Sequence, residues 1–254
     1  VYWNVTFEKL TVRNNTMNGY SHLILMPESQ VITMRGFELS SNYIYSTTIT
    51  RKEKGLIESP SSGTTFSVMN FNLSQNTFIG QLILMRFPQF SSLEFDQWTC
   101  KGNNFIRGTT QTAEDSHARV LTSASNSIIK LSNLEFDDNT IVNSYYFMEL
   151  KSSTIFIRDM RVIGNSITAQ NSVSFVFAEN SDLIVDNFTI SGNVMDASIL
   201  GLMIFDRVSN STFSNGRIDN NDCIGNVRFI DVRGVMNITN ITIASNNLTG
   251  RNGA

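Results

Sequence analysis

The sequence predicts a right-handed parallel β-helix, an all-β solenoid of about nine coils that each hold about 27 residues and three short strands. One observation is a motif that recurs nine times and places an asparagine at the same point in each copy. A second is the alternation of apolar and polar residues inside that motif. A third is the composition, with 29 Asn, 30 Ser and 23 Thr among 254 residues but only three Pro. Together they indicate many short strands separated by polar turns.

The motif reads apolar, any, apolar, any, any, Asn, any, apolar, as in FTISGNVM at residues 188–195. Eight copies match it fully, and the remaining copy has Gly216 at the first apolar position. An asparagine tolerates left-handed backbone, and stacked amides can bond from coil to coil. We therefore expect a ladder of turn residues, built from Asn15, Asn42, Asn76, Asn103, Asn139, Asn165, Asn193, Asn221 and Asn246.

The position between the first two apolar residues is polar in every copy, which predicts strands with one buried and one solvated face. These polar residues are Thr11, Glu38, Asn72, Thr99, Glu135, Arg161, Thr189, Arg217 and Thr242. Successive ladder asparagines lie 25 to 36 residues apart. A β-propeller blade needs about 40 to 50 residues, so this spacing favours a solenoid. Right-handed winding is the default for parallel crossover connections.

The whole chain, residues 1–254, is expected to form one β-helix domain. Two coils are longer than the others, and their extra residues fall in the polar segments 51–65 and 107–119. We expect lateral loops there, which are either sites of function or tolerated insertions. The motif starts close to Val1 and ends close to Ala254 without a capping helix. This pattern is expected of a segment of a longer solenoid or of a filament subunit that stacks end to end.

Composition argues against several classes of partner. Charged residues make up 16% of the chain, the net charge is −3 and no stripe of Lys and Arg is present, so a nucleic-acid partner is not expected. No apolar run is long enough for a membrane span.

The segments FDDN at 136–139 and VIGN at 162–165 resemble the FxxN repeat of the polymorphic membrane protein adhesins. The resemblance extends from Leu10 to Leu248, although Phe is often replaced by Val, Leu or Ile and the companion GGA-type motif is missing. It implies a secreted right-handed β-helix of pectin-lyase-like architecture with an adhesive role.

A second set of asparagines lies in Asn-x-Ser/Thr sequons for N-glycosylation. No ladder asparagine is a sequon, because the residue two positions later is apolar. We expect several sequons to carry N-linked glycans, which places the protein outside the cell or on its surface. The candidates are Asn4, Asn14, Asn72, Asn187, Asn210, Asn237, Asn240 and Asn247.

Cys100 and Cys223 occupy inward positions four coils apart. At about 4.8 Å per coil they are separated by about 19 Å. The Cα atoms of a disulfide lie within about 7 Å of each other, so no intrachain bridge is expected. Both residues should be buried thiols.

The sequence offers little for catalysis. The acidic pairs Asp137-Asp138 and Asp219…Asp222 belong to different coils, and His22 and His117 lack metal-ligand spacing. We therefore expect no enzyme activity, no metal and no cofactor.

The expected function is that of a non-enzymatic, extracellular, N-glycosylated structural or adhesive solenoid that assembles end to end into a filament or stalk. Besides other copies of itself, such a solenoid would bind a surface glycan or a protein ligand. The alternatives are a polysaccharide-active β-helix enzyme, a tailspike-like glycan depolymerase, or a glycan-binding module that uses the two lateral loops.

Overall fold

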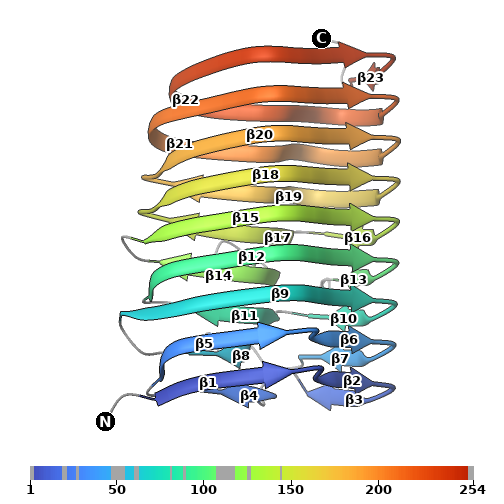
Figure 1. The fold of residues 1–254 in the computed structure, drawn as a ribbon. Helices are drawn as coiled ribbons and strands as arrows, with labels where there is room; N and C mark the ends of the chain where they lie inside the picture. Colours follow the sequence, from blue (N-terminus) through green and yellow to red (C-terminus); the bar gives the residue numbers. More distant parts are fainter. Residues whose placement is uncertain are drawn as a thin grey trace.

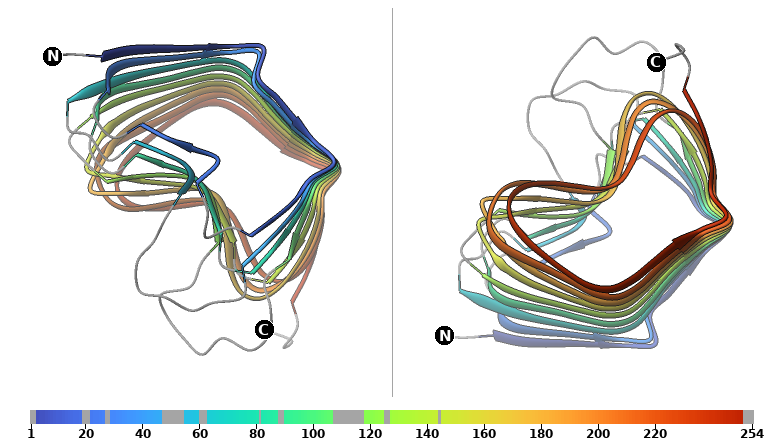
Figure 2. Two further views of the ribbon diagram at one scale, coloured as in Figure 1. Left: turned by 90° about the horizontal axis from the view of Figure 1, so that it is seen from below. Right: turned by 90° about the horizontal axis from the view of Figure 1, so that it is seen from above.

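The computed structural model of the chain is a parallel β-solenoid, as predicted (Figure 1). It describes residues 3–18, 22–26, 29–46, 55–59, 63–80, 82–87, 90–106, 118–124, 127–143 and 145–250. Figure 2 shows the coil along its axis: seen from the N-terminal end, the chain runs clockwise as it moves away from the viewer. This is right-handed winding. Across the described residues, no helix is long and apolar enough to cross a membrane.

The front sheet faces the viewer in Figure 1 and is built from longer strands than the second sheet. Its neighbours pair in parallel and in register, so that Trp98 lies between Phe71 and Leu134 of the adjoining coils. The strands, in order along the axis, are β1 (Trp3–Glu8) with β2 (Thr11–Arg13), β5 (Ser29–Arg35) with β6 (Glu38–Ser40), β9 (Thr64–Ser74), β12 (Phe90–Lys101), β15 (Ile128–Asp137), β18 (Thr154–Ile163), β20 (Asp182–Ser191), and the last parts of β21 (Val194–Asp219) and β22 (Asp222–Ala244).

The second sheet follows the ladder turn and is narrow. Its strands are β3 (Thr16–Asn18), β7 (Tyr43–Tyr45), β10 (Thr77–Ile79), β13 (Asn104–Ile106), β16 (Thr140–Val142), the first parts of β19 (Ser166–Glu179), β21 and β22, and β23 (Asn247–Thr249). The third sheet closes each coil with β4 (Ile24–Leu25), β8 (Gly55–Glu58), β11 (Ile83–Phe87), β14 (Ala118–Ala124), β17 (Tyr145–Lys151) and later parts of β19, β21 and β22.

Three strands per coil occur in the middle of the solenoid, for example β12, β13 and β14. Toward the C-terminus the second and third strands join into one continuous strand, as in β19. The solenoid has about seven turns, slightly fewer than the nine coils expected. The difference lies at the ends: the rungs of Asn15 and Asn246 each have one neighbouring rung, whereas those between them have two.

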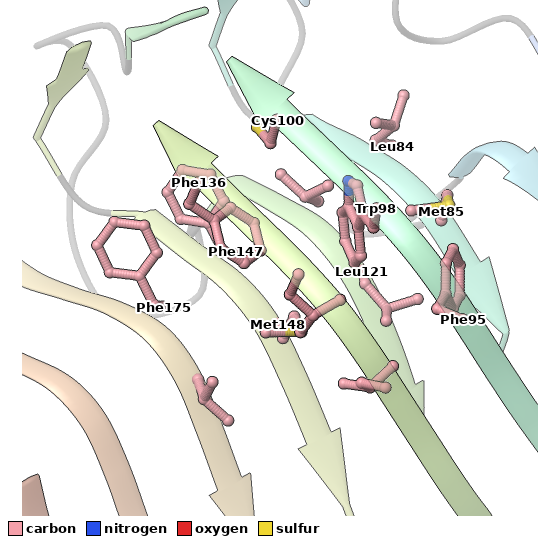
Figure 3. Packing of buried hydrophobic residues seen from close by; sticks show 14 of the residues in the cluster. Leu84, Met85, Phe95, Trp98, Cys100, Leu121, Phe136, Phe147, Met148 and Phe175 are labelled. Carbon is pink, nitrogen blue, oxygen red and sulfur yellow. The ribbon is translucent and has the colours of Figure 1, made fainter. Parts of the chain in front are cut away.

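The core runs along the axis between the three sheets and is filled by the inward residues of the motif. Phe37 stacks on Phe71 with ring centroids 5.1 Å apart, and Phe147 stacks on Phe175 at 4.7 Å. Trp98 is fully buried, and its ring lies 5.1 Å from that of Phe95 and 5.6 Å from that of Phe136 (Figure 3). Because each coil places its apolar side chains above those of the previous coil, identical columns produce aromatic stacks along the axis.

The predicted lateral loops are partly strand. Within 51–65, residues 55–58 form β8 and Thr64 begins β9, so the expectation of a loop is wrong there. The physical reason is pairing: β8 pairs with β11 and contributes the buried Leu56 and Ile57 to the core. Within 107–119, Ala118 and Arg119 belong to β14. Residues 51–54, 60–62 and 107–117 of the two segments lie outside the described residues, and His117 is among them.

Candidate functional site

The nine ladder asparagines form one continuous column of hydrogen bonds at the corner between the front and second sheets. In each step the backbone N–H of one asparagine donates to the Oδ1 atom of the next, at 2.9 to 3.1 Å. The side-chain Nδ2 atom donates to the same Oδ1 atom at 2.8 to 3.2 Å. The column therefore links every rung to the next through side chains as well as backbone.

The eight ladder asparagines from Asn42 to Asn246 also donate to a backbone carbonyl of the preceding coil. Nδ2 of Asn139, for example, donates to the carbonyl of Cys100 in the preceding coil at 2.8 Å. The seven asparagines from Asn42 to Asn221 are at most 2% exposed. A buried amide is tolerated only when its donors and acceptors are satisfied, and this ladder satisfies both. The column is thus a structural device that an apolar side chain could not replace.

The ladder asparagines do not take the left-handed conformation expected of them. The residue immediately before each one does, with φ between 53° and 66°. The left-handed turn and the ladder bond are thus divided between two neighbouring residues. The left-handed residues are Asn14, Ser41, Gln75, Gly102, Asp138, Gly164, Gly192, Asn220 and Ser245.

A second left-handed column, which the sequence analysis missed, lies six residues before each ladder asparagine. Its residues have φ between 53° and 66°. Figure 2 shows that the front sheet is bent, with its convex side facing the outside of the solenoid. The members of this column differ in residue type, which hides the repeat: Lys9, Gly36, Asn70, Gln97, Asn133, Asp159, Asn187, Asn215 and Asn240. The fixed offset of six residues is the signal that could have revealed it.

A polar groove of about 510 Å³ lies on the outer face of the front sheet, beside this bend column. It is lined by the bend residues Asn70, Gln97 and Asn133 and by the neighbouring outward residues Asn72, Thr99 and Glu135. Its position on β9, β12 and β15 is set by the registers of those three strands.

The sequon asparagines all lie on or near the solvent-facing surface. Seven of them are exposed and Asn72 is half-buried. Asn187 and Asn240 belong to the bend column, which explains why they share one phase and face outward. Some sequon amides bond to the neighbouring rung: Nδ2 of Asn240 donates to Oδ1 of Asn215 at 2.7 Å.

The two acidic turns do not form one site. Asp137 and Asp219 occupy the same column but are three rungs apart, about 14 Å at about 4.8 Å per rung. Asp219 is not the solvated residue expected of a turn: it is 3% exposed and pairs with Arg217, whose hydrogen bond lowers the pKa of the Asp219 carboxyl. Asp137 shows the opposite shift, because burial raises the pKa of its carboxyl.

Both cysteines are free, buried thiols, as predicted. The Cys100 thiol lies beside the ladder, with Sγ 3.7 Å from Oδ1 of Asn139, and burial raises its pKa strongly. Burial, with a smaller contribution from the charge of Asp222, raises the pKa of Cys223 to about 11. Neither thiol has the thiolate character that reactive cysteines need.

A charged cluster that the sequence analysis also missed lies on the third sheet, which turns inward and makes the cross-section concave (Figure 2). Glu58 accepts hydrogen bonds from Arg86 at 2.7 Å, from the N–H of Gly55 at 2.9 Å and from His22 at 3.2 Å. Farther along the sheet Glu149 pairs with Arg119 and Lys151. These contacts join residues up to 36 positions apart, so no local motif signals them.

The Glu58 cluster predicts a pH dependence of stability. Burial alone would raise the pKa of Glu58, but its bonds to Gly55, His22 and Arg86 outweigh burial and hold the pKa below its ordinary value. A carboxyl with a lowered folded-state pKa stabilises the fold above its unfolded pKa of about 4.3, and that contribution is lost as the pH falls through the folded value. When the free energy of unfolding is measured with urea between pH 7 and pH 3, its decrease toward acid pH should therefore be smaller for Glu58→Gln than for the wild type.

The exposed Glu94 supplies the control for this experiment. Glu94→Gln should keep the wild-type dependence on pH. An equal acid-induced decrease in the free energy of unfolding for Glu58→Gln and the wild type would contradict the assignment of Glu58 as a stabilising charged group.

Comparison with protein-family models and with curated proteins gives no significant match for this chain. The likeness of FDDN and VIGN to the adhesin repeat is thus a likeness of pattern, while the fold rests on the strand pairing and the ladder.

Proposed function

We propose that the chain is a non-enzymatic, extracellular, N-glycosylated solenoid that serves as a structural or adhesive rod. The observation that carries the proposal is the separation of two asparagine sets. The seven ladder asparagines from Asn42 to Asn221 are buried and hydrogen-bonded to the rungs on both sides, whereas the sequon set lies at the solvent-facing surface. A rod with a continuous internal ladder resists bending at every rung, and glycans on its flanks would keep it soluble and protect it.

Growth along the axis is part of the proposal. On the rung of Asn246, Val235, Ile243 and Leu248 are 62–65% exposed. The ladder is directional: each rung offers amide donors on one side and an Oδ1 acceptor on the other. A further rung with the same motif would cover these apolar side chains and continue the ladder, whether it comes from the same polypeptide or from a second copy. Such stacking would yield the filament or stalk.

Glycopeptide mapping tests the proposal. After secretion of the chain from a eukaryotic host, we expect glycans on several sequons, among them the exposed Asn187, Asn210 and Asn240. An unmodified chain at all eight sequons would contradict it. The ladder residue Asn165 has no sequon and provides the internal control for correct assignment.

A polysaccharide-active enzyme is the second candidate, and the observation that favours it is Asp137. Its carboxyl has a raised pKa, as a general acid needs, and Glu135 and Arg161 are among the charges around it. Polysaccharide cleavage that is lost in Asp137→Asn would favour the enzyme over the rod. The second acidic turn lies about 14 Å away, farther than paired glycosidase carboxylates, which are at most about 9.5 Å apart.

A further inference from the structure

We propose that the groove on the outer face of the front sheet is a seat for the N-linked glycan of Asn72. The first sugars of this glycan lie against the protein, whereas the other glycans extend into solvent. The inference rests on the proposed glycosylation and adds which sequon differs from the rest and which residues hold its sugar.

The position of Asn72 is the first argument. It is half-buried while the other seven sequon asparagines are exposed, and its side chain lines the groove. In the sheet it lies between Glu38 of the coil before and Thr99 of the coil after. A sugar linked to its Nδ2 atom therefore starts inside the groove.

The chemistry of the lining is the second argument. Amides of Asn70, Gln97 and Asn133 form one wall, and Thr99 and Glu135 continue the other beyond Asn72. Adjacent rungs are about 4.8 Å apart. Amides and hydroxyls both donate and accept hydrogen bonds, and a carboxylate accepts them, which suits the hydroxyl and acetamido groups of an N-linked core. The groove volume of about 510 Å³ is in the range of small-molecule sites, about 300–1,000 Å³.

Hydrogen bonding within the bend column separates two of the groove amides from the rest. Farther along the column, Asn187 donates to Asp159 and Asn215 donates to Asp186, each in the adjoining coil, and Asn133 in the groove donates to Asp96 in the same way at 2.7 Å. In the groove, Asn70 and Gln97 make no side-chain hydrogen bond to any other described residue. These amides face the space that the glycan would fill, so sugar groups can satisfy them without displacing protein contacts.

Release of glycans by peptide-N-glycosidase from the native, secreted chain tests the seat. Site by site, we expect the Asn72 glycan to be released about tenfold more slowly than that of Asn210, a factor that corresponds to about 1.4 kcal/mol. After denaturation the two rates should be equal. The double variant Gln97→Gly/Thr99→Val should raise the native rate at Asn72 to that at Asn210. Ser166→Ala, an exposed change on the second sheet, should leave it unchanged.

Two results would overturn the seat and leave the proposed function intact. One is an occupied Asn72 whose native release is as fast as that of Asn210. The other is an unmodified Asn72 in a chain that carries glycans at the exposed sequons. A chain without any glycan would overturn the proposed function together with the seat.

Discussion

Replacing Asn103 with alanine is expected to lower the free energy of unfolding by about 3 to 5 kcal/mol. Asn103 is fully buried, and its Oδ1 atom accepts from the N–H and the Nδ2 atom of Asn76 at 2.9 and 3.0 Å. Its own Nδ2 atom donates to the carbonyl of Leu73 at 2.9 Å. Alanine removes the acceptor of the Asn76 N–H and one of the two acceptors of its Nδ2 atom, which keeps its bond to the carbonyl of Leu39 at 2.7 Å, and it removes the donor to Leu73. Each buried group left unsatisfied costs about 1–3 kcal/mol.

The neighbouring residue makes a matched control for this prediction. Asn104 has the same side chain but is exposed on β13. In urea unfolding, Asn104→Ala should change stability by less than about 0.5 kcal/mol. A similar decrease in the free energy of unfolding for Asn103→Ala and Asn104→Ala would show that the ladder adds no stability beyond the backbone pairing of the strands.

Gly216→Ala is expected to destabilise the fold by about 3 kcal/mol, at the upper end for one inserted methyl group. A Cβ atom at residue 216 would lie 2.2 Å from Cζ of the Phe188 ring, which fills the space above Gly216 in the adjoining coil. This contact also explains why one copy of the motif lacks its first apolar residue: Phe188 occupies the room for two side chains.

Removing the ring should rescue this variant. In a Phe188→Ala background the Gly216→Ala change should be nearly neutral, because the clash is gone, and a double-mutant cycle measures the coupling. Gly250→Ala is the control, since a Cβ atom there meets no other atom within 4 Å. A Gly216→Ala variant as stable as Gly250→Ala would contradict the packing described for this column.

The architecture could be predicted because its signal is periodic. Each inward position of the motif is set by pairing with the coil before and after, so one residue pattern fixes strand phase, coil length and the ladder together. Cys100 and Cys223 were placed correctly for the same reason. The predicted number of coils was slightly too high. Every copy of the motif was counted as a coil, including the two terminal copies, whose rungs have a neighbour on one side only.

The features that were missed depend on conformation or on distant contacts. The bend column recurs as faithfully as the ladder, but residues as different as Lys9, Gly36 and Gln97 adopt it, so residue type does not reveal it. The Glu58 cluster is assembled by the third sheet from separate coils. Asp219 is buried and paired with Arg217, two residues earlier on the same strand, which the pattern of the turn alone does not show.

Native-state hydrogen exchange at the seven internal ladder asparagines tests the central claim most directly, namely that this column holds the rungs together as one rigid unit. The residues are Asn42, Asn76, Asn103, Asn139, Asn165, Asn193 and Asn221. We predict that their backbone N–H groups exchange only through global unfolding, with the same free energy at every rung. Exchange of any internal rung through local opening, at a free energy well below the global value, would contradict the account.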